Sequence, residues 1–260
     1  MSFVTTSDDV KLHYVDEGEG PAVLFVGGFG MAASGWLLQR RALSLRHRLI
    51  TVDRRSHGDS DHGRHGNRMA RHAADLHEAL TAVGVDDVVA IGASMGASVL
   101  WSYVDLYGTD RLRGMVTIDQ TPKMVNDDGW TCGMFGLEPD GVESFVREFP
   151  GAHNPFHRMP PPDVLGLLRG GQTPPYDDLR PLLRDHTWAD WRDVLPRIDV
   201  PLLAIAGRHS PLWPCAHAEQ LAAAAPRGRC VILDDSGHVP FLEQPEVVNA
   251  TLAAFLSDVT

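Results

Sequence analysis

The chain has 260 residues, of which 43% are hydrophobic and 22% charged, as in an ordinary globular protein. This length suits one α/β domain with room for an inserted subdomain. The formal net charge is −11, which argues against nucleic acid or an anionic membrane as a partner, because both select a basic surface.

Three further features concern the compartment. The N-terminal residues lack the charged and apolar pattern of a secretory signal, and no apolar run is long enough to span a bilayer. Cys132, Cys215 and Cys230 are odd in number and share no metal-type spacing, so we expect free thiols in a reducing compartment. We therefore expect a soluble cytoplasmic protein. The sequence does not indicate an oligomeric state.

Strand and helix patterns alternate along most of the chain. Short β-branched runs predict strands at 12–16, 22–26, 48–53, 87–91, 112–119, 201–206 and 230–233. Apolar residues at helical spacing predict helices at 32–45, 70–83, 97–107, 216–225 and 246–256. This alternation predicts a doubly wound α/β fold with a mostly parallel sheet.

The alternation stops between residues 120 and 196. This segment is rich in proline and aromatic residues and has few β-branched runs, so it is too apolar for a disordered linker and too interrupted for a sheet. We interpret 120–196 as a helical cap inserted into a core formed by 1–119 and 197–260.

A strand-to-helix turn carries the first chemical motif. The pentapeptide GASMG at 92–96 follows the strand expected at 87–91 and precedes the helix expected at 97–107. A serine in G-x-S-x-G at such a turn exposes its hydroxyl at the start of a helix, as in a nucleophile elbow. The alternative is that Ser94 only caps the helix, which the context of strand, motif and helix does not favour.

A serine nucleophile needs a histidine base, and that histidine needs an orienting carboxylate. Of the 13 histidines, His238 is best placed, since it follows the last expected strand and precedes the last helix. A histidine there can reach the carboxyl ends of the central strands, where parallel sheets bind ligands. The alternative is a histidine satisfied within the core.

The chain resembles the α/β-hydrolase superfamily over nearly its whole length. The resemblance rests on GASMG together with VLFVGGFG, DRRSHGDSD and SGHVPFLEQPE. It implies that Ser94 is the nucleophile and His238 the base. It also implies an oxyanion hole formed by the backbone N–H groups of Phe29 and Met95, and no cofactor.

The sequence departs from the family pattern in three places. Glycine stands at position 27, where the family usually has histidine, and serine stands at 56 in place of a glycine. The third departure is Ser210, which occupies the usual position of the triad acid. Asp119 ends a neighbouring strand, and some members, including lactone-cleaving enzymes, take the acid from there. We therefore expect Asp119 to be the acid.

Asp119 and the other candidate acids also have simpler interpretations. Asp119 alternatively caps the first turn of the cap segment. Asp234 and Asp235 lie too close to His238 in sequence to reach its far nitrogen easily, and Asp53 belongs to a turn that the family uses structurally.

The substrate pocket is expected to be apolar. Its candidate residues are Gly28, Trp130, Met134, Phe135, Trp188, Trp191 and Trp213. Each aromatic residue is alternatively ordinary core of the cap.

Two polar groups of residues carry weaker signals. His57, Asp59, Asp61, His62 and His65 lie close together in sequence, but the stretch is broken by glycines and lacks zinc-type spacing, so we interpret it as a solvated loop and expect no metal. The second group consists of the arginines Arg40, Arg41, Arg54 and Arg55. We interpret them as surface and hinge ion pairs rather than anion-binding residues. The alternative, anion binding, applies to Arg54 or Arg55, which lie near the ligand end of the sheet.

The sequence thus predicts a metal-independent serine hydrolase that cleaves a small apolar ester or lactone. Two alternatives remain at this point. One is cofactor-free perhydrolase or haloperoxidase-like chemistry through an acyl-enzyme. The other is a small-ligand sensor built on the same pocket, which the departures at positions 27 and 210 favour.

Overall fold

The computed structural model describes residues 2–63, 65–151, 154–168, 170 and 174–259. One eight-stranded sheet has the order β1-β2-β4-β3-β5-β6-β7-β8. The strands are β1 (Ser2–Thr5), β2 (Lys11–Glu17), β3 (Ala22–Val26), β4 (Arg48–Val52), β5 (Val88–Ala93), β6 (Leu112–Ile118), β7 (Leu202–Gly207) and β8 (Gly228–Leu233).

The helices follow the strands in the order expected of a doubly wound fold. The α-helices are α1 (Leu37–Leu43), α2 (Met69–Ala82), α3 (Met95–Tyr107), α4 (Val142–Glu148), α5 (Pro162–Leu167), α6 (Tyr176–Trp188), α7 (Ala216–Ala224), α8 (Pro240–Glu243) and α9 (Pro245–Val259). The 3₁₀ helices are η1 (Ala33–Trp36), η2 (Pro139–Gly141) and η3 (Leu195–Arg197).

Strands β3 to β8 pair in parallel, whereas β1 and β2 form an antiparallel edge against β4. The predicted α/β class with a mostly parallel sheet is confirmed. Strand β1 was not predicted, because its four residues are too few to show an alternating pattern. The helix expected at 32–45 is a 3₁₀ turn followed by the short α1.

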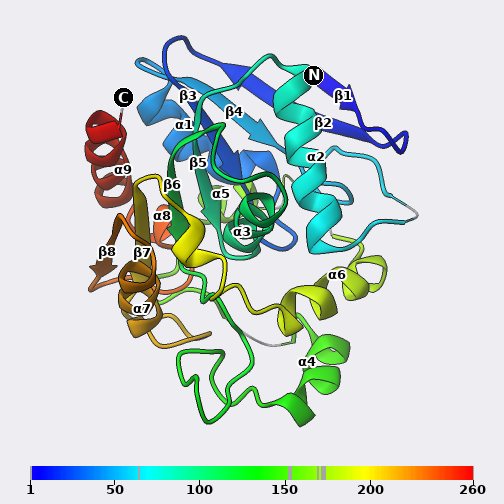
Figure 1. The fold of residues 1–260 in the computed structure, drawn as a ribbon, viewed down its shortest axis with the longest axis vertical. Coiled ribbons are helices and arrows are strands. Elements are labelled where there is room, and N and C mark those ends of the chain that lie inside the picture. Colours follow the sequence, from blue (N-terminus) through cyan, green and yellow to red (C-terminus); the bar gives the residue numbers. More distant parts are fainter. Residues whose placement is uncertain (1, 64, 152–153, 169, 171–173, 260) are drawn as a thin grey trace.

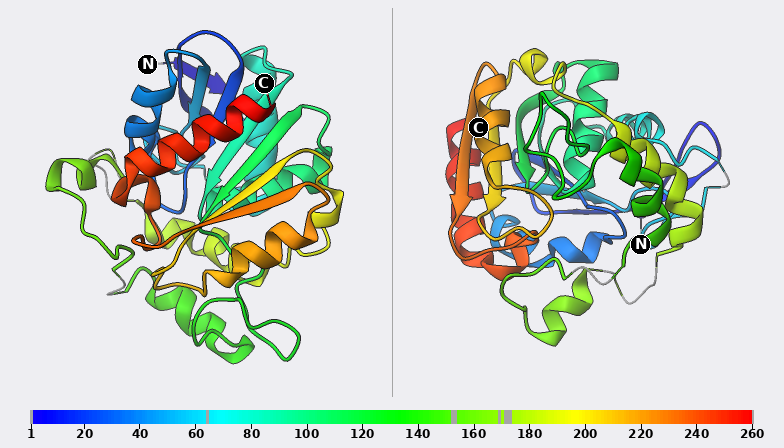
Figure 2. Two further views of the ribbon diagram at one scale, coloured as in Figure 1. Left: turned by 90° about the vertical axis from the view of Figure 1, so that its left-hand side faces the viewer. Right: turned by 90° about the horizontal axis from the view of Figure 1, so that it is seen from below.

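Both faces of the sheet are covered by apolar helices, which explains the continuous apolar runs of its strands. In β3, Val23 and Phe25 belong to the core that includes residues of α1, α8 and α9, while Leu24 and Val26 belong to the core that includes residues of α2, α3 and α7. Figure 2 shows the long α9 lying along one face of the sheet. Alternate side chains of one strand therefore belong to two hydrophobic cores, one on each face of the sheet.

The chain between β6 and β7 forms no named strand within its described residues and contains α4, α5 and α6. Helices α4 and α6 lie at the end of the molecule opposite both termini (Figures 1 and 2). The connection has the helical character expected of the cap, and the boundaries 120 and 196 stay a prediction. Of the helices that the structure describes, none combines the length and the apolar character needed to cross a bilayer.

Candidate active site

Ser94 lies on a strained turn between β5 and α3. Its φ is +50° and its ψ −131°, a conformation that costs a non-glycine residue energy and is typical of functional turns. The turn requires glycine on both sides. A Cβ on Gly96 would lie 2.2 Å from the carbonyl oxygen of Val26, and one on Gly92 would lie 2.6 Å from the nitrogen of Ala97. These close approaches explain the G-x-S-x-G spacing.

His238 lies in the loop after β8 and reaches back to the serine. Its Nε2 is 3.0 Å from Oγ of Ser94, and its Nδ1 is 2.7 Å from Oδ2 of Asp119. A carboxylate only accepts hydrogen bonds, so Nδ1–H donates to Asp119 and the lone pair of Nε2 faces the serine hydroxyl. The backbone N–H of His238 donates to the carbonyl of Pro155, which ties this loop to the cap segment.

Asp119 follows β6 directly, in a left-handed conformation with φ +46°. Its side chain is fully buried and accepts hydrogen bonds from the N–H of Gly207 (3.0 Å) and the hydroxyl of Ser210 (2.7 Å). Burial alone raises the pKa of this carboxyl, but the contacts with His217 and His238 outweigh burial and hold the pKa well below its usual range. Asp119 is therefore an anion in the folded protein.

The structure thus brings Ser94, His238 and Asp119 together in one hydrogen-bonded chain. Sequence reasoning missed His217, which is buried on α7 with Nε2 3.7 Å from Oδ1 of Asp119. Its signal was the helical pattern of 216–225, which places this histidine one turn before the buried Leu221.

Phe29 and Met95, the two residues expected to supply oxyanion donors, line one cavity with Ser94. Met95 is the first residue of α3, where the helix offers no internal acceptor. Within the described part of the chain, the N–H of Phe29 donates no backbone hydrogen bond. Gly28 packs so closely on the nucleophile that a Cβ there would lie 3.1 Å from Cβ of Ser94. The loop after β3 is therefore adjacent to the serine hydroxyl.

A cavity of about 220 Å³ opens onto Ser94 and His238. Its walls are mostly apolar, and Trp213 meets the ring of His238 edge-on with 5.3 Å between ring centroids. Three of the predicted pocket residues line this cavity: Gly28, Met134 and Trp213. Side chains that sequence reasoning missed complete the wall: Met31, Met124, Phe145, Phe149, Tyr176, Leu183, His186 and Leu212.

The other four predicted aromatic residues are not among those that line the cavity. Phe135 is 57% exposed and Trp188 is 50% exposed, so both side chains face outward. The indole of Trp130 donates to the carbonyl of Lys123 and lies under the guanidinium of Arg192, while Trp191 packs against the larger core. The aromatic composition of the segment between β6 and β7 gave no direction to individual side chains.

His186 is a second histidine of the cavity wall, besides His238. It is buried, and its Nδ1 has no hydrogen-bond partner in the described structure. Burial, with a smaller contribution from the charge of Arg54, lowers the pKa of His186 to about 3. The signal for its position was helical spacing, since Leu179, Leu183 and His186 share the buried face of α6.

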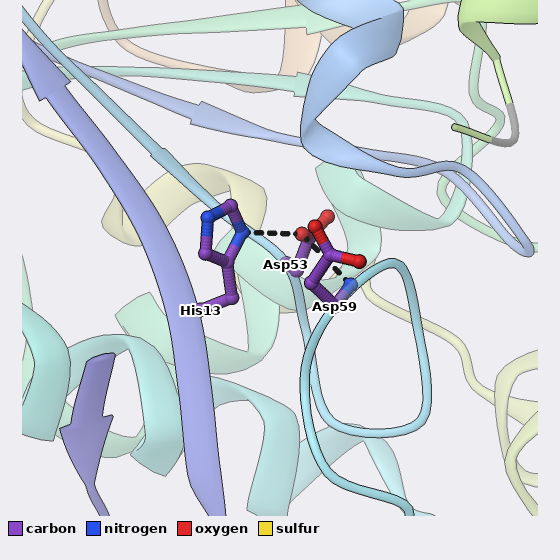
Figure 3. Close-up of side chains that lie close together, drawn as sticks. All are labelled: His13, Asp53 and Asp59. Atoms are coloured by element: carbon purple, nitrogen blue, oxygen red, sulfur yellow. Dashed lines mark hydrogen bonds and ion pairs between the residues drawn. The ribbon is translucent and has the colours of Figure 1, made fainter. Parts of the chain in front are cut away.

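The predicted solvated histidine loop is corrected at one position. His57 is buried, whereas the neighbouring His65 is exposed. Among the described residues, the potential metal ligands that converge are His13, Asp53 and Asp59 (Figure 3). Asp53 accepts hydrogen bonds from His13 Nδ1 at 2.7 Å and from the backbone N–H groups of Ala33 and Asp59. These bonds give Asp53 a structural function that joins β2, η1 and the loop after β4.

The prediction for the arginines is corrected too. Arg40 forms the expected surface pair with Glu17. Arg54 and Arg55, however, are almost fully buried. Arg55 makes ion pairs with Asp75 and Asp8, and these pairs keep it charged inside the protein.

A mostly parallel sheet that carries a hydrogen-bonded serine, histidine and aspartate at its carboxyl edge is the architecture of the α/β-hydrolase class. A family model described as "Alpha/beta hydrolase family" matches residues 23–251, and the chain belongs to this family.

Individual relatives match over the full length. The chain is 29% identical to a non-heme haloperoxidase of Rhodococcus erythropolis, covering 98% of this chain and 99% of that protein. It is 27% identical to a pimeloyl-[acyl-carrier protein] methyl ester esterase of Vibrio vulnificus, covering 94% and 97%. The solved esterase of Exiguobacterium antarcticum has the same fold, with a TM-score of 0.89, 22% identity and coverage of 98% and 99%.

Proposed function

We propose that this protein hydrolyses a carboxylic ester or lactone through an acyl-enzyme on Ser94. The observation that carries the proposal is the unbroken chain of hydrogen bonds from Ser94 through His238 to the buried anion Asp119. It supplies a nucleophile, a base and an orienting acid in one line.

In the acylation step, Nε2 of His238 takes the proton of the Ser94 hydroxyl while Oγ attacks the substrate carbonyl. Asp119 stabilises the resulting imidazolium and keeps the ring oriented. The N–H groups of Phe29 and Met95 donate hydrogen bonds to the developing oxyanion, and losing one such donor costs about 3–4 kcal/mol of barrier. The imidazolium then protonates the leaving alcohol.

In the second step, His238 removes a proton from water, which attacks the acyl-Ser94 carbonyl. Collapse of this second tetrahedral intermediate releases the acid and returns the proton to Oγ. The chain's own residues supply every proton transfer, so the proposed reaction requires neither a metal nor a cofactor.

The cavity favours a small apolar substrate. Its volume of about 220 Å³ lies below the range of about 300–1,000 Å³ that is usual for ligand pockets, and its walls are mostly methionine, leucine and aromatic side chains. The relative from Vibrio vulnificus is named as a methyl ester esterase, which supports an ester of a small alcohol. A lactone remains in the proposal because lactone-cleaving members place their acid as this chain does.

Ser94→Ala tests the proposal. We expect the variant to fold and to lose hydrolysis of p-nitrophenyl esters, since Oγ faces His238 rather than the core. A series of p-nitrophenyl esters of increasing chain length, together with several lactones, defines the substrate. A fluorophosphonate probe should label Ser94 of the wild type, as located by peptide mass spectrometry. A Ser94→Ala enzyme that retains more than a few per cent of the activity would disprove the mechanism.

A second candidate function is perhydrolysis, supported by the haloperoxidase relative. Hydrogen peroxide in place of water would attack the same acyl-Ser94, giving a peroxy acid and the free serine. Peroxide-dependent formation of peracetic acid from acetate, absent in Ser94→Ala, would support it. The intact hydrogen bond between His238 and Asp119 argues against the sensor alternative, because a sensor has no need of a working triad.

A further inference from the structure

Arg54 places a buried guanidinium against the loop that carries the Phe29 N–H. The side chain is almost fully buried, and its Nη2 donates to the carbonyl oxygen of Gly28 at 2.7 Å. Its Nε donates to the carbonyl oxygen of Gly27 at 3.2 Å. One rigid cation therefore holds two consecutive carbonyl groups of this loop.

The other contacts of this guanidinium are to neutral groups. Nη1 is 3.0 Å from Nδ1 of His72, and Nη2 is 3.1 Å from Nε2 of His57. Burial, followed by the charge of Arg54, holds the pKa of each of these histidines well below its usual value, so both rings are neutral acceptors. Nδ1–H of His57 donates to the carbonyl of Arg55, which leaves its Nε2 lone pair for Arg54.

Arg54 differs in this respect from its neighbour Arg55. No carboxylate hydrogen-bonds to Arg54 among the residues that the structure describes, whereas Arg55 bonds to two. Burial lowers the pKa of Arg54 to about 9, which still leaves the side chain protonated at neutral pH. The charges of Asp75 and Asp53 offset part of this burial. A buried cation that lacks a direct ion pair within the described structure is still costly, and such a cost is typical of a functional residue.

Peptide geometry connects this cation to the proposed oxyanion hole. The carbonyl of Gly28 and the N–H of Phe29 belong to one planar trans peptide group, so they point in opposite directions. A donor that fixes the carbonyl oxygen therefore fixes the N–H. A cation on the oxygen also polarises the peptide and strengthens its N–H as a donor. Met31 N–H donates to the same oxygen at 3.2 Å, which adds a second constraint.

We propose that Arg54 is a positioning residue of the oxyanion hole, which orients and polarises the Gly28–Phe29 peptide toward the nucleophile. This inference rests on the proposed hydrolase function. Arg54 also contacts the sulfur of Met95, whose N–H is the second proposed donor. The chain has glycine at position 27, where the family pattern has histidine, and Arg54 approaches the same loop from the segment that follows β4.

The experiment compares Arg54→Lys and Arg54→Met with the control Arg55→Lys. Lysine keeps the charge but cannot hold both carbonyls at once, and methionine keeps volume without charge. Arg55 is adjacent and equally buried, and it does not contact the loop, so Arg55→Lys reports the effect of disturbing a buried arginine. For each enzyme we would measure kcat and KM on a p-nitrophenyl ester. We would also measure the affinity for a trifluoromethyl ketone, which forms an oxyanion on Ser94, and for the matching unreactive alcohol.

We expect Arg54→Lys to lower kcat and trifluoromethyl ketone affinity in parallel, by about 10²-fold, the effect of losing one oxyanion donor. Arg54→Met should lower both by a similar or larger factor. KM and alcohol affinity should stay close to wild type. Arg55→Lys should lower thermal stability without lowering the affinity for the ketone more than the affinity for the alcohol. If Arg54→Met does not fold, the same measurements on Arg54→Lys still test the proposal.

Equal losses for ketone and alcohol, or an unchanged kcat in Arg54→Lys, would overturn the inference and leave Arg54 a structural residue. Failure of the hydrolase proposal looks different, because wild-type enzyme would then neither turn over esters nor react with the ketone at Ser94.

Discussion

Ser210 Oγ donates a hydrogen bond of 2.7 Å to Oδ2 of Asp119, the same oxygen that faces Nδ1 of His238 at 2.7 Å. Ser210, at the position where the family pattern has the acid, therefore contacts Asp119, the acid that we propose. The two positions meet because β6 and β7 are neighbours, with Ile118 paired to Ile205. A carboxylate at the end of β6 therefore reaches Nδ1 of His238 from beside the end of β7.

Asp119→Asn should lower kcat by about 10³–10⁴-fold, because the amide favours the wrong tautomer of His238 and leaves the imidazolium without a counter-charge. Steady-state kinetics on a p-nitrophenyl ester measure the loss. Asp234→Asn, which changes an exposed carboxylate on the His238 loop, is the matched control and should keep wild-type activity. Near-wild-type kcat in Asp119→Asn would remove Asp119 from the mechanism.

The contact between positions 119 and 210 predicts a compensating pair. Ser210→Asp alone places two carboxylates together in a buried site, so one must take up a proton, and we expect lower stability and activity. In the Asp119→Asn background the new carboxylate has no such neighbour and can face His238 Nδ1. We therefore expect Asp119→Asn/Ser210→Asp to be more active than Asp119→Asn.

Ser210→Ala completes this series. Asp119 keeps its bonds from Gly207 and His238, so the loss in kcat should be far smaller than in Asp119→Asn. A double variant no better than Asp119→Asn would show that position 210 cannot supply the acid in this chain.

The sheet and the turn that carries Ser94 were predictable because their signals are local. The strands are continuous apolar runs, and the strained Ser94 turn admits only glycine at positions 92 and 96. Asp119 required a different argument, since it depends on the end of one strand lying next to the end of another. That adjacency was an expectation from the resemblance to the α/β-hydrolase superfamily, and β6 and β7 are indeed neighbours in the sheet.

Buried charge and pocket direction were not predictable from the same patterns. Arg54 stands in a polar stretch of sequence that is typical of a surface loop, yet its guanidinium is buried by the β3 loop and two neutral histidines. Trp188 is the last residue of α6, whose opposite face is buried. The spacing of apolar residues in this helix did not show whether Trp188 lines the cavity or faces solvent. Both outcomes depend on tertiary contacts that join distant segments.

Dialysis against a chelator should leave the hydrolysis rate unchanged, since the proposed nucleophile, base and acid are all side chains. The competing explanation would be a metal ion bound by His13, Asp53 and Asp59, whose side chains converge (Figure 3). His13→Gln tests it separately, and its effect should be on thermal stability rather than kcat. Chelator-sensitive activity that zinc restores, and that His13→Gln abolishes, would show that this group binds a metal needed for turnover.

The buried His186 predicts acid sensitivity of the fold. In the unfolded chain its imidazole binds a proton below about pH 6.5, whereas in the folded protein its pKa is lowered to about 3 by burial and by Arg54. Between these values the unfolded state binds more protons, so the free energy of unfolding falls as the pH falls. One such group contributes about 1.4 kcal/mol per pH unit.

His186→Leu removes this contribution and fills the same apolar wall of the cavity. We expect the pH dependence of its unfolding free energy, measured by urea denaturation between about pH 6.5 and about pH 4, to be shallower than in wild type by about 1 kcal/mol per pH unit. The exposed His209, changed to glutamine, is the control and should leave the slope unchanged. His57 and His72 shift in the same direction, so part of the slope should remain in His186→Leu. An unaltered slope in that variant would show that His186 takes up its proton without opposing the fold.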